Sequence, residues 1–153
     1  ILASLVIGAF AETIEQAVAL AVLMPIVASM GGNAGTQTLT VAVRALAMKE
    51  LTPANATRVI IKEVIVGGIN GILFAVIAAA VAGLWFQDLN LALVMAIAMV
   101  VTMVVAGLAG TAIPLGLALR GIDPAVASAV FLTTVTDVVG FFAFLGLASW
   151  VLL

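Results

Sequence analysis

Short polar breaks divide the sequence into long apolar runs, and this pattern limits the folds open to the chain. The runs cover residues 1–11, 17–48, 59–86, 91–119 and 125–153. A membrane-spanning helix needs about 20 apolar residues, which the last four runs provide, whereas a membrane barrel needs alternating segments of about 10. We therefore predict an all-α integral membrane protein with five transmembrane helices. The first of these is expected to be a truncated span, because its run reaches only about halfway across a bilayer.

Composition agrees with a lipid environment and restricts the chemistry. The chain is 66% hydrophobic and 8% charged, against about 25% charged residues in a soluble domain. It contains no Cys and no His, which excludes thiolate and imidazole metal sites and thiol nucleophiles. A bound metal must therefore have oxygen ligands, which suit hard cations such as Mg²⁺, Ca²⁺ and Mn²⁺. We do not expect an enzyme, since one carboxylate without His or Cys makes a poor catalytic set.

The placement of charge predicts the orientation of the chain. With five spans, the breaks at 49–58 and 120–124 share one face of the membrane, and those at 12–16 and 87–90 share the other. Every basic residue lies on or next to the first face: Arg44, Lys49, Arg58, Lys62 and Arg120. Since cytoplasmic loops carry the excess of Lys and Arg, we expect a multi-pass protein of the inner (plasma) membrane. Its N-terminus would be cytoplasmic and its C-terminus extracytoplasmic.

Asp137 is the one carboxylate within the last apolar run. At about 1.5 Å per helical residue it lies roughly 20 Å from Pro124, near the middle of a hydrocarbon layer about 30 Å thick. A carboxylate at that depth costs several kcal/mol unless a partner or water stabilises it. Its own run contains no Lys, Arg or His. The expected partner is therefore a cation from outside the chain, and Asp137 is the predicted metal-binding residue.

Polar residues also recur at helical spacing in two of the runs. The second run carries Ser29, Asn33, Thr36 and Thr40 at intervals of four, three and four residues, which places them on one helix face. In the last run a similar stripe surrounds Asp137. Such hydroxyls either bond back to their own helix or line an ion path. The predicted pore-lining residues are Ser29, Asn33, Thr36, Thr133, Thr134 and Gly140.

Other features have structural interpretations. The pair Gly67 and Gly71 is a small-xxx-small pattern typical of helix packing, and Asn70 is expected to hydrogen-bond between helices. Lys62 and Glu63 are expected to reach the cytoplasmic surface or to pair with residues there.

A single carboxylate per chain is too little charge to bind a divalent ion well, but a two-fold homodimer would place a second Asp137 across the axis of a central pore. A largely hydrated Mg²⁺ would suit such a site.

Several segments then resemble a known family. Residues 25–37 read Pro-Ile-Val-Ala-Ser-Met-Gly-Gly-Asn-Ala-Gly-Thr-Gln, residues 43–47 read Val-Arg-Ala-Leu-Ala, Lys62 and Glu63 follow, and residues 123–137 begin Asp-Pro-Ala and end Thr-Asp. In this order and spacing they resemble the transmembrane domain of the MgtE family of magnesium channels, over nearly the whole chain.

The resemblance implies a homodimer in a lipid bilayer, with five helices per subunit around a Mg²⁺ pore and no nucleic-acid partner. Residues 1–153 would be the transmembrane pore domain. The family's cytoplasmic N and CBS domains, which close the pore at high intracellular Mg²⁺, are absent from this chain. By motif position, Asp137 is similar to the aspartate that binds hydrated Mg²⁺. Some members have Asn in place of Thr36 and Asn-Pro in place of residues 129–130, which leaves the choice among Mg²⁺, Mn²⁺, Co²⁺ and Ca²⁺ open.

Alternative functions differ in how the ion moves. The expected function is passive conduction of hydrated Mg²⁺ into the cytoplasm. A coupled carrier, exchanging Mg²⁺ for Na⁺ or H⁺, is the main alternative, although such carriers usually contain internal repeats and none is evident here. A membrane anchor without transport activity is disfavoured by the polar stripes and by the unpaired Asp137.

Overall fold

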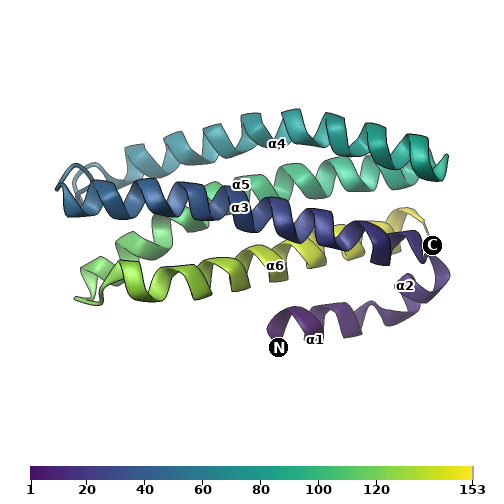
Figure 1. Ribbon diagram of the computed structural model, residues 1–153, viewed down its shortest axis with the longest axis horizontal. Helices are drawn as coiled ribbons and strands as arrows, with labels where there is room; N and C mark the ends of the chain where they lie inside the picture. The colour runs from purple at the N-terminus through teal and green to yellow at the C-terminus, as the bar shows by residue number, and fades with distance from the viewer. Residues whose placement is uncertain (153) are drawn as a thin grey trace.

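The regular elements of the chain are helices throughout the part that the computed structural model describes, residues 1–152. They are α1 (Leu2–Ala9), α2 (Ala11–Gln16), α3 (Ala19–Ala47), α4 (Ala56–Phe86), α5 (Leu89–Leu119) and α6 (Pro124–Val151). The four long helices run antiparallel to their chain neighbours in one bundle (Figure 1). This confirms the prediction of an all-α protein.

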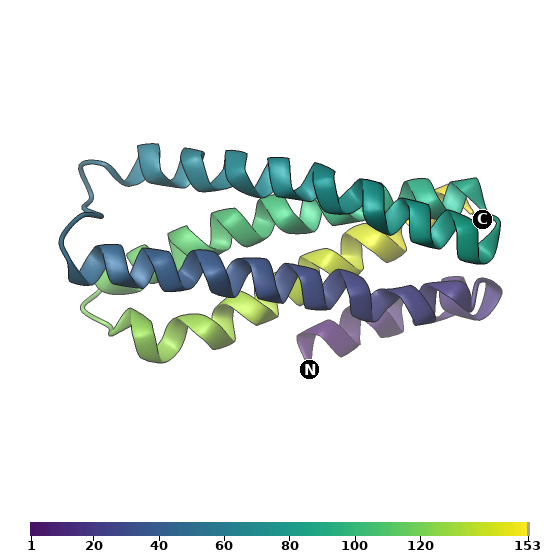
Figure 2. The same cartoon turned by 45° about the horizontal axis from the view of Figure 1, so that its top comes forward.

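α5 is the central helix of the bundle. It packs along α3, α4 and α6, while α3 also packs on α6 and touches α4 at few points. The turned view in Figure 2 shows α4 and α3 on either side of α5. α1 lies against the C-terminal half of α6, where Phe10 and Phe142 make an edge-to-face ring contact at 5.8 Å. Because α5 is covered on three sides, it is the most buried of the membrane-length helices in the described part of the chain.

Four helices are long and apolar enough to cross a membrane: α3, α4, α5 and, within α6, Ser128–Val151. These helices correspond to the last four predicted spans. The broader prediction, a helical integral membrane protein, therefore agrees with the structure. The first apolar run instead forms the short helices α1 and α2, with Glu12 and Glu15 inside α2 rather than in a loop. A fifth span therefore remains a prediction.

Aspartates begin two of the long helices. The side chain of Asp88 accepts hydrogen bonds from the amides of Asn90 (2.8 Å) and Leu91 (3.1 Å) at the start of α5. Asp123 accepts from the amide of Ala125 at 2.9 Å, and Pro124 occupies the first turn of α6. Both side chains satisfy amides that lack a partner within the helix. The Asp-Pro pair therefore marks the start of α6.

Glycines allow α4 and α5 to approach backbone to backbone. A Cβ on Gly67 would lie 2.6 Å from the carbonyl oxygen of Met103, and one on Gly71 would lie 3.1 Å from the Cα of Val100. Gly107 makes the reciprocal contact, since its Cβ would lie 2.5 Å from the carbonyl oxygen of Glu63. The small-xxx-small pattern therefore packs helices, as predicted.

The outer surface of the bundle is largely apolar along α4. Ile69, Leu73 and Val76 of α4 are more than half exposed. The core lies between α3, α5 and α6 and includes Leu20, Met95, Phe144 and Leu145. Since a soluble protein rarely exposes such a continuous apolar surface, α4 presents the face that lipid would cover.

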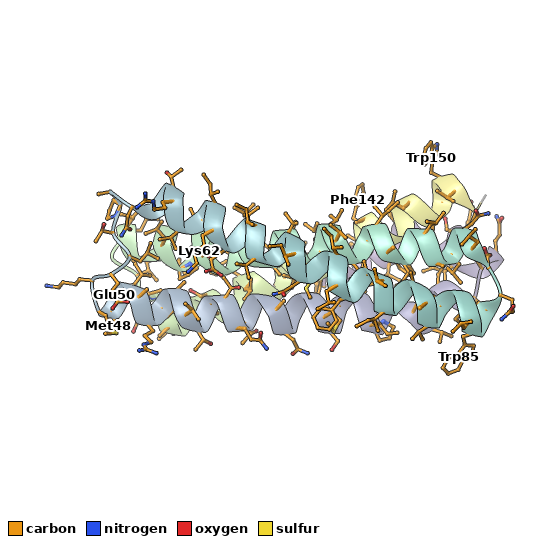
Figure 3. All side chains as sticks on the ribbon, turned by 90° about the horizontal axis from the view of Figure 1, so that it is seen from above. Met48, Glu50, Lys62, Trp85, Phe142 and Trp150 are labelled. Atoms are coloured by element: carbon orange, nitrogen blue, oxygen red, sulfur yellow. The ribbon has the colours of Figure 1, made fainter. Side chains whose placement is uncertain are left out.

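The charges separate between the two ends of the bundle. The α3–α4 and α5–α6 connections lie at one end and the α2–α3 and α4–α5 connections at the other (Figure 1). All five Lys and Arg residues lie in or beside the first pair of connections, and we call this the basic end. Figure 3 shows Lys62 toward this end and Trp85 and Trp150 toward the opposite end. The predicted grouping of the connections is confirmed.

Candidate cation pathway

A polar stripe runs along the exposed face of α3. Ser29, Asn33, Thr36 and Thr40 are all exposed, whereas Gly31, Gly35, Leu39 and Ala42, on the other face, are buried. The two sets alternate with the helical period, as the spacing predicts. The sequence prediction that these polar side chains share one face is therefore confirmed.

Packing of the small residues fixes which side of α3 points outward. A Cβ on Gly31 would collide with the methyl group of Thr102 on α5 and would lie 3.5 Å from the Cβ of Thr136 on α6. A Cβ on Gly35 would lie 3.0 Å from a methyl carbon of Leu132. Because this face of α3 is held closely against α5 and α6, the opposite face with the polar stripe is left uncovered.

The hydrogen bonds of the stripe leave its oxygen atoms free to accept. The Thr36 hydroxyl donates to the carbonyl of Gly32, and the Thr40 hydroxyl donates to the carbonyl of Thr36, both at 2.8 Å. The Asn33 side-chain amide donates to the Ser29 hydroxyl oxygen at 3.4 Å. Hydroxyls that donate to carbonyls of their own helix can be explained by helix structure alone. This bonding also turns the donors inward and the lone pairs outward, which favours a cation or the water around it.

On α6, Asp137 lies close to the helix midpoint, roughly 20 Å from either end at about 1.5 Å per residue. It is half-buried and is the one charged residue of this helix. The hydroxyl of Thr133, one turn earlier, is exposed and donates to the carbonyls of Ala129 and Val130 at 3.0 and 3.3 Å. The Thr134 hydroxyl donates to the Val130 carbonyl at 2.8 Å.

The α3–α6 contact brings the two polar regions to one depth. Gly31, between Ser29 and Asn33 in sequence, faces Thr136, the residue before Asp137. The Ser29–Asn33 end of the α3 stripe and the carboxylate therefore lie at the same level of the bundle. Within residues 1–152 no group of three or more acidic side chains could hold a metal ion. One chain thus supplies a single carboxylate with neutral oxygen atoms near it.

Gly140 differs from the other predicted pore-lining residues because it is buried. A Cβ at this position would lie 3.3 Å from the Thr102 hydroxyl oxygen and from a methyl carbon of Val27. In this subunit its observed role is to allow close packing of α6 against α5 and α3. In contrast, Ala129 and Val130, where the sequence departs from the family pattern, are exposed.

Sequence reasoning missed one polar region. Gln37, Glu63 and Asn70 line a cavity between α3 and α4, beside the α3 stripe. Gln37 follows Asn33 by one helical turn, and this spacing is the signal that extends the stripe toward α4. Glu63 is half-buried, so the cavity rather than the membrane surface is its observed environment.

These features define a class: a helical membrane protein whose bundle displays neutral oxygen atoms and one carboxylate near the middle of a membrane-length helix. Comparison with known sequences gives the family. The MgtE family, described as divalent cation transporters, matches residues 24–147. The chain belongs to this family.

Curated relatives agree with the assignment. The magnesium transporter MgtE of Enterococcus faecalis is 38% identical over 94% of this chain and 32% of its own length. The magnesium transporters MgtE of Bacillus subtilis and Thermus thermophilus are 33% and 31% identical, over 94% and 97% of this chain. The chain spans about a third of the length of these relatives.

Proposed function

We propose that this chain forms the ion-conducting part of a magnesium transporter and passes hydrated Mg²⁺ into the cytoplasm. The observation that carries the proposal is the exposed oxygen stripe of α3 at the level of Asp137 on α6. The match to divalent cation transporters supports the substrate class. Transport, rather than catalysis, also agrees with the absence of His and Cys.

The ion is proposed to keep its water. Mg²⁺ gives up its hydration shell reluctantly, and the six waters of an octahedral shell donate hydrogen bonds outward. The hydroxyl groups of Thr36, Thr40 and Thr133 already donate to helix carbonyls. Their oxygen atoms would therefore accept hydrogen bonds from those waters. Ions with a similar oxygen shell, such as Mn²⁺ and Co²⁺, would compete, and Ca²⁺, which takes 6–8 ligands, less well.

We further propose a homodimer with the pore on its two-fold axis. A polar stripe facing lipid is costly, and a second copy would cover the stripes of both chains. Two Asp137 side chains would then bring a charge of −2 toward a divalent ion. The distribution of basic residues favours the basic end as the cytoplasmic one, in the inner (plasma) membrane.

The test is Mg²⁺ uptake into liposomes containing the full-length protein. Asp137→Asn should reduce the uptake to the level of empty liposomes, because the amide keeps the shape and removes the charge. Asp88→Asn is the matched control: it makes the same change at a helix start, where Asn caps as well as Asp. Unchanged uptake in Asp137→Asn would refute the assignment.

Electrical recording separates conduction from exchange. A current that reverses at the Mg²⁺ equilibrium potential and ignores Na⁺ and pH gradients supports a channel. A reversal potential that shifts with either gradient supports the coupled carrier instead.

A further inference from the structure

We propose that the cavity between α3 and α4 is a second cation station, built around Glu63 and placed between Asp137 and the basic end. Four polar side chains line it: Gln37 and Thr38 from α3, and Glu63 and Asn70 from α4. The ligand is a hydrated divalent cation. Its role in transport rests on the proposed function, whereas its existence as a binding site does not.

Helix geometry explains why this cavity forms. α5 lies between α3 and α4, which touch at few points. Gly67 and Gly107 bring the backbones of α4 and α5 together and also line the cavity. The missing side chains leave room beside Glu63, whose own carbonyl makes the closest contact with Gly107. The space therefore depends on the same glycines that hold the helices together.

The size of the cavity suits an ion that keeps its water. Its volume is about 180 Å³. A cavity needs roughly 10–15 Å³ of this space to hold one water, so there is room for a cation with the six waters that Mg²⁺ holds in octahedral geometry. The side chains would thus contact the water shell rather than the metal, as carboxylate and amide oxygens do in an outer shell.

The cavity differs from a large apolar groove elsewhere on α4. That groove, on the outer side of α4 and α5, is lined by apolar side chains alone, among them Ile72, Val76 and Val101. The cavity around Glu63 contains polar side chains from two helices and no basic residue. It is the polar one of the two, and its single formal charge is negative.

The cavity also adjoins the proposed pathway. Gln37 lies one helical turn beyond Asn33 toward the basic end, so the oxygen stripe of α3 leads to it. At about 1.5 Å per residue, Asn70 lies roughly 21 Å and Glu63 roughly 10 Å from the start of α4. The lining therefore covers the part of the membrane between the level of Asp137 and the basic end.

Arg44 offers the competing explanation for Glu63. It follows Gln37 by two helical turns on α3, about 10 Å along the axis, and it is exposed. Lys62, by contrast, precedes Glu63 directly and so points to a different side of α4. If Glu63 serves only to pair with Arg44, then the cavity binds no cation. The experiment must separate these two roles.

The test measures Mn²⁺ binding to the purified full-length protein, by the loss of the electron paramagnetic resonance signal of free Mn²⁺. Glu63→Gln should weaken one class of sites by roughly 10- to 100-fold, the usual loss on removing an outer-shell partner. Glu50→Gln is the matched control, because Glu50 is exposed in the α3–α4 connection at the same end. The same weakening of Mn²⁺ binding by Glu63→Gln should appear in a protein that already carries Asp137→Asn.

A second set of variants covers the case in which Glu63→Gln does not fold. Asn70→Leu and Gln37→Met nearly preserve volume at exposed positions, and together they should weaken the same class of sites. Mn²⁺ binding equal to that of Glu50→Gln in all of these variants overturns the proposal. So does a loss of thermal stability in Glu63→Gln that Arg44→Gln reproduces while Mn²⁺ binding is unchanged, since that result assigns Glu63 to an ion pair.

Flux measurements then test the role of the station. Glu63→Gln should raise the half-saturating Mg²⁺ concentration for flux that starts at the basic end, with less effect on flux that starts at the opposite end. An equal reduction in both directions contradicts a station on one side of Asp137. Mn²⁺ bound at Glu63 in a protein without Mg²⁺ flux would refute the proposed function and leave the site standing.

Discussion

Gly107→Ala is the sharpest test of how α4 and α5 are packed. The new Cβ would lie 2.5 Å from the carbonyl oxygen of Glu63 and 3.1 Å from its carbonyl carbon. Both atoms belong to the backbone of α4, so no side-chain rotation can relieve the contact. The two helices must move apart, and the contacts of Gly67 and Gly71, one and two turns away along α4, must loosen with them.

The expected loss can be worked from this geometry. Overpacking of this kind costs about 1–3 kcal/mol, and a backbone obstacle places it at the upper end. Part of this cost is offset, because alanine stabilises a helix by about 0.5–1 kcal/mol relative to glycine. The net destabilisation is about 1–2 kcal/mol. At roughly 2–4 °C per kcal/mol for a chain of this size, the midpoint of heat denaturation should fall by roughly 2–8 °C.

Gly116→Ala on the same helix provides the control. No atom lies within 4 Å of a Cβ built at Gly116, so only the propensity gain applies and the midpoint should rise slightly or stay constant. The assay is size-exclusion chromatography of heated, detergent-solubilised protein. If Gly107→Ala is as stable as Gly116→Ala, the backbones of α4 and α5 do not approach as described.

Three further substitutions test the interior. Gly31→Ala alone should destabilise the protein, and Thr102→Ser should restore much of the lost stability because it removes the methyl group that the new Cβ meets. A double-mutant cycle of these two changes should give a coupling energy of about 0.5–3 kcal/mol. Additive effects on stability would contradict the contact. Ser128→Ala should be neutral or stabilising in heat denaturation, because the Ser128 hydroxyl oxygen is buried without a hydrogen-bond partner within residues 1–152 and such a group costs about 1–3 kcal/mol. A clear loss of stability would mean that the hydroxyl has a partner, such as water or a second subunit.

Local rules were sufficient to predict the helices and the orientation of the α3 stripe. Apolar runs long enough for a bilayer can bury their backbone only as helices, and Asp123 marks the start of α6 as its capping side chain predicts. Ser29 and Asn33 are exposed because their spacing follows one helix face while the glycines follow the other. The place of Asp137 near the middle of α6 followed from counting residues.

Contacts between helices could not be predicted in the same way. Gly140 shares a face of α6 with Asp137 by spacing alone, yet it is buried, because α5 brings Thr102 against it. Likewise, the environment of Glu63 depends on α5 holding α3 and α4 apart. Spacing within one helix carries no information about which neighbour covers each face. The first apolar run shows the same limit, since it folds as two short helices beside α6.

The distribution of polar residues along α3 explains why one carboxylate matters more than the hydroxyls. From Ser29 to Thr40 the exposed face is polar, whereas toward the opposite end the same face presents Val22 and Ile26. In the proposed pathway, a hydrated cation entering from that end would gain no oxygen contacts from this face of α3 until it reached the level of Asp137. At that depth neutral hydroxyls offset only part of the lost hydration, so the charge of Asp137 must supply the remainder. In the proposed pathway, the hydroxyls and the cavity at Glu63 would then act on an ion that the carboxylate has already admitted.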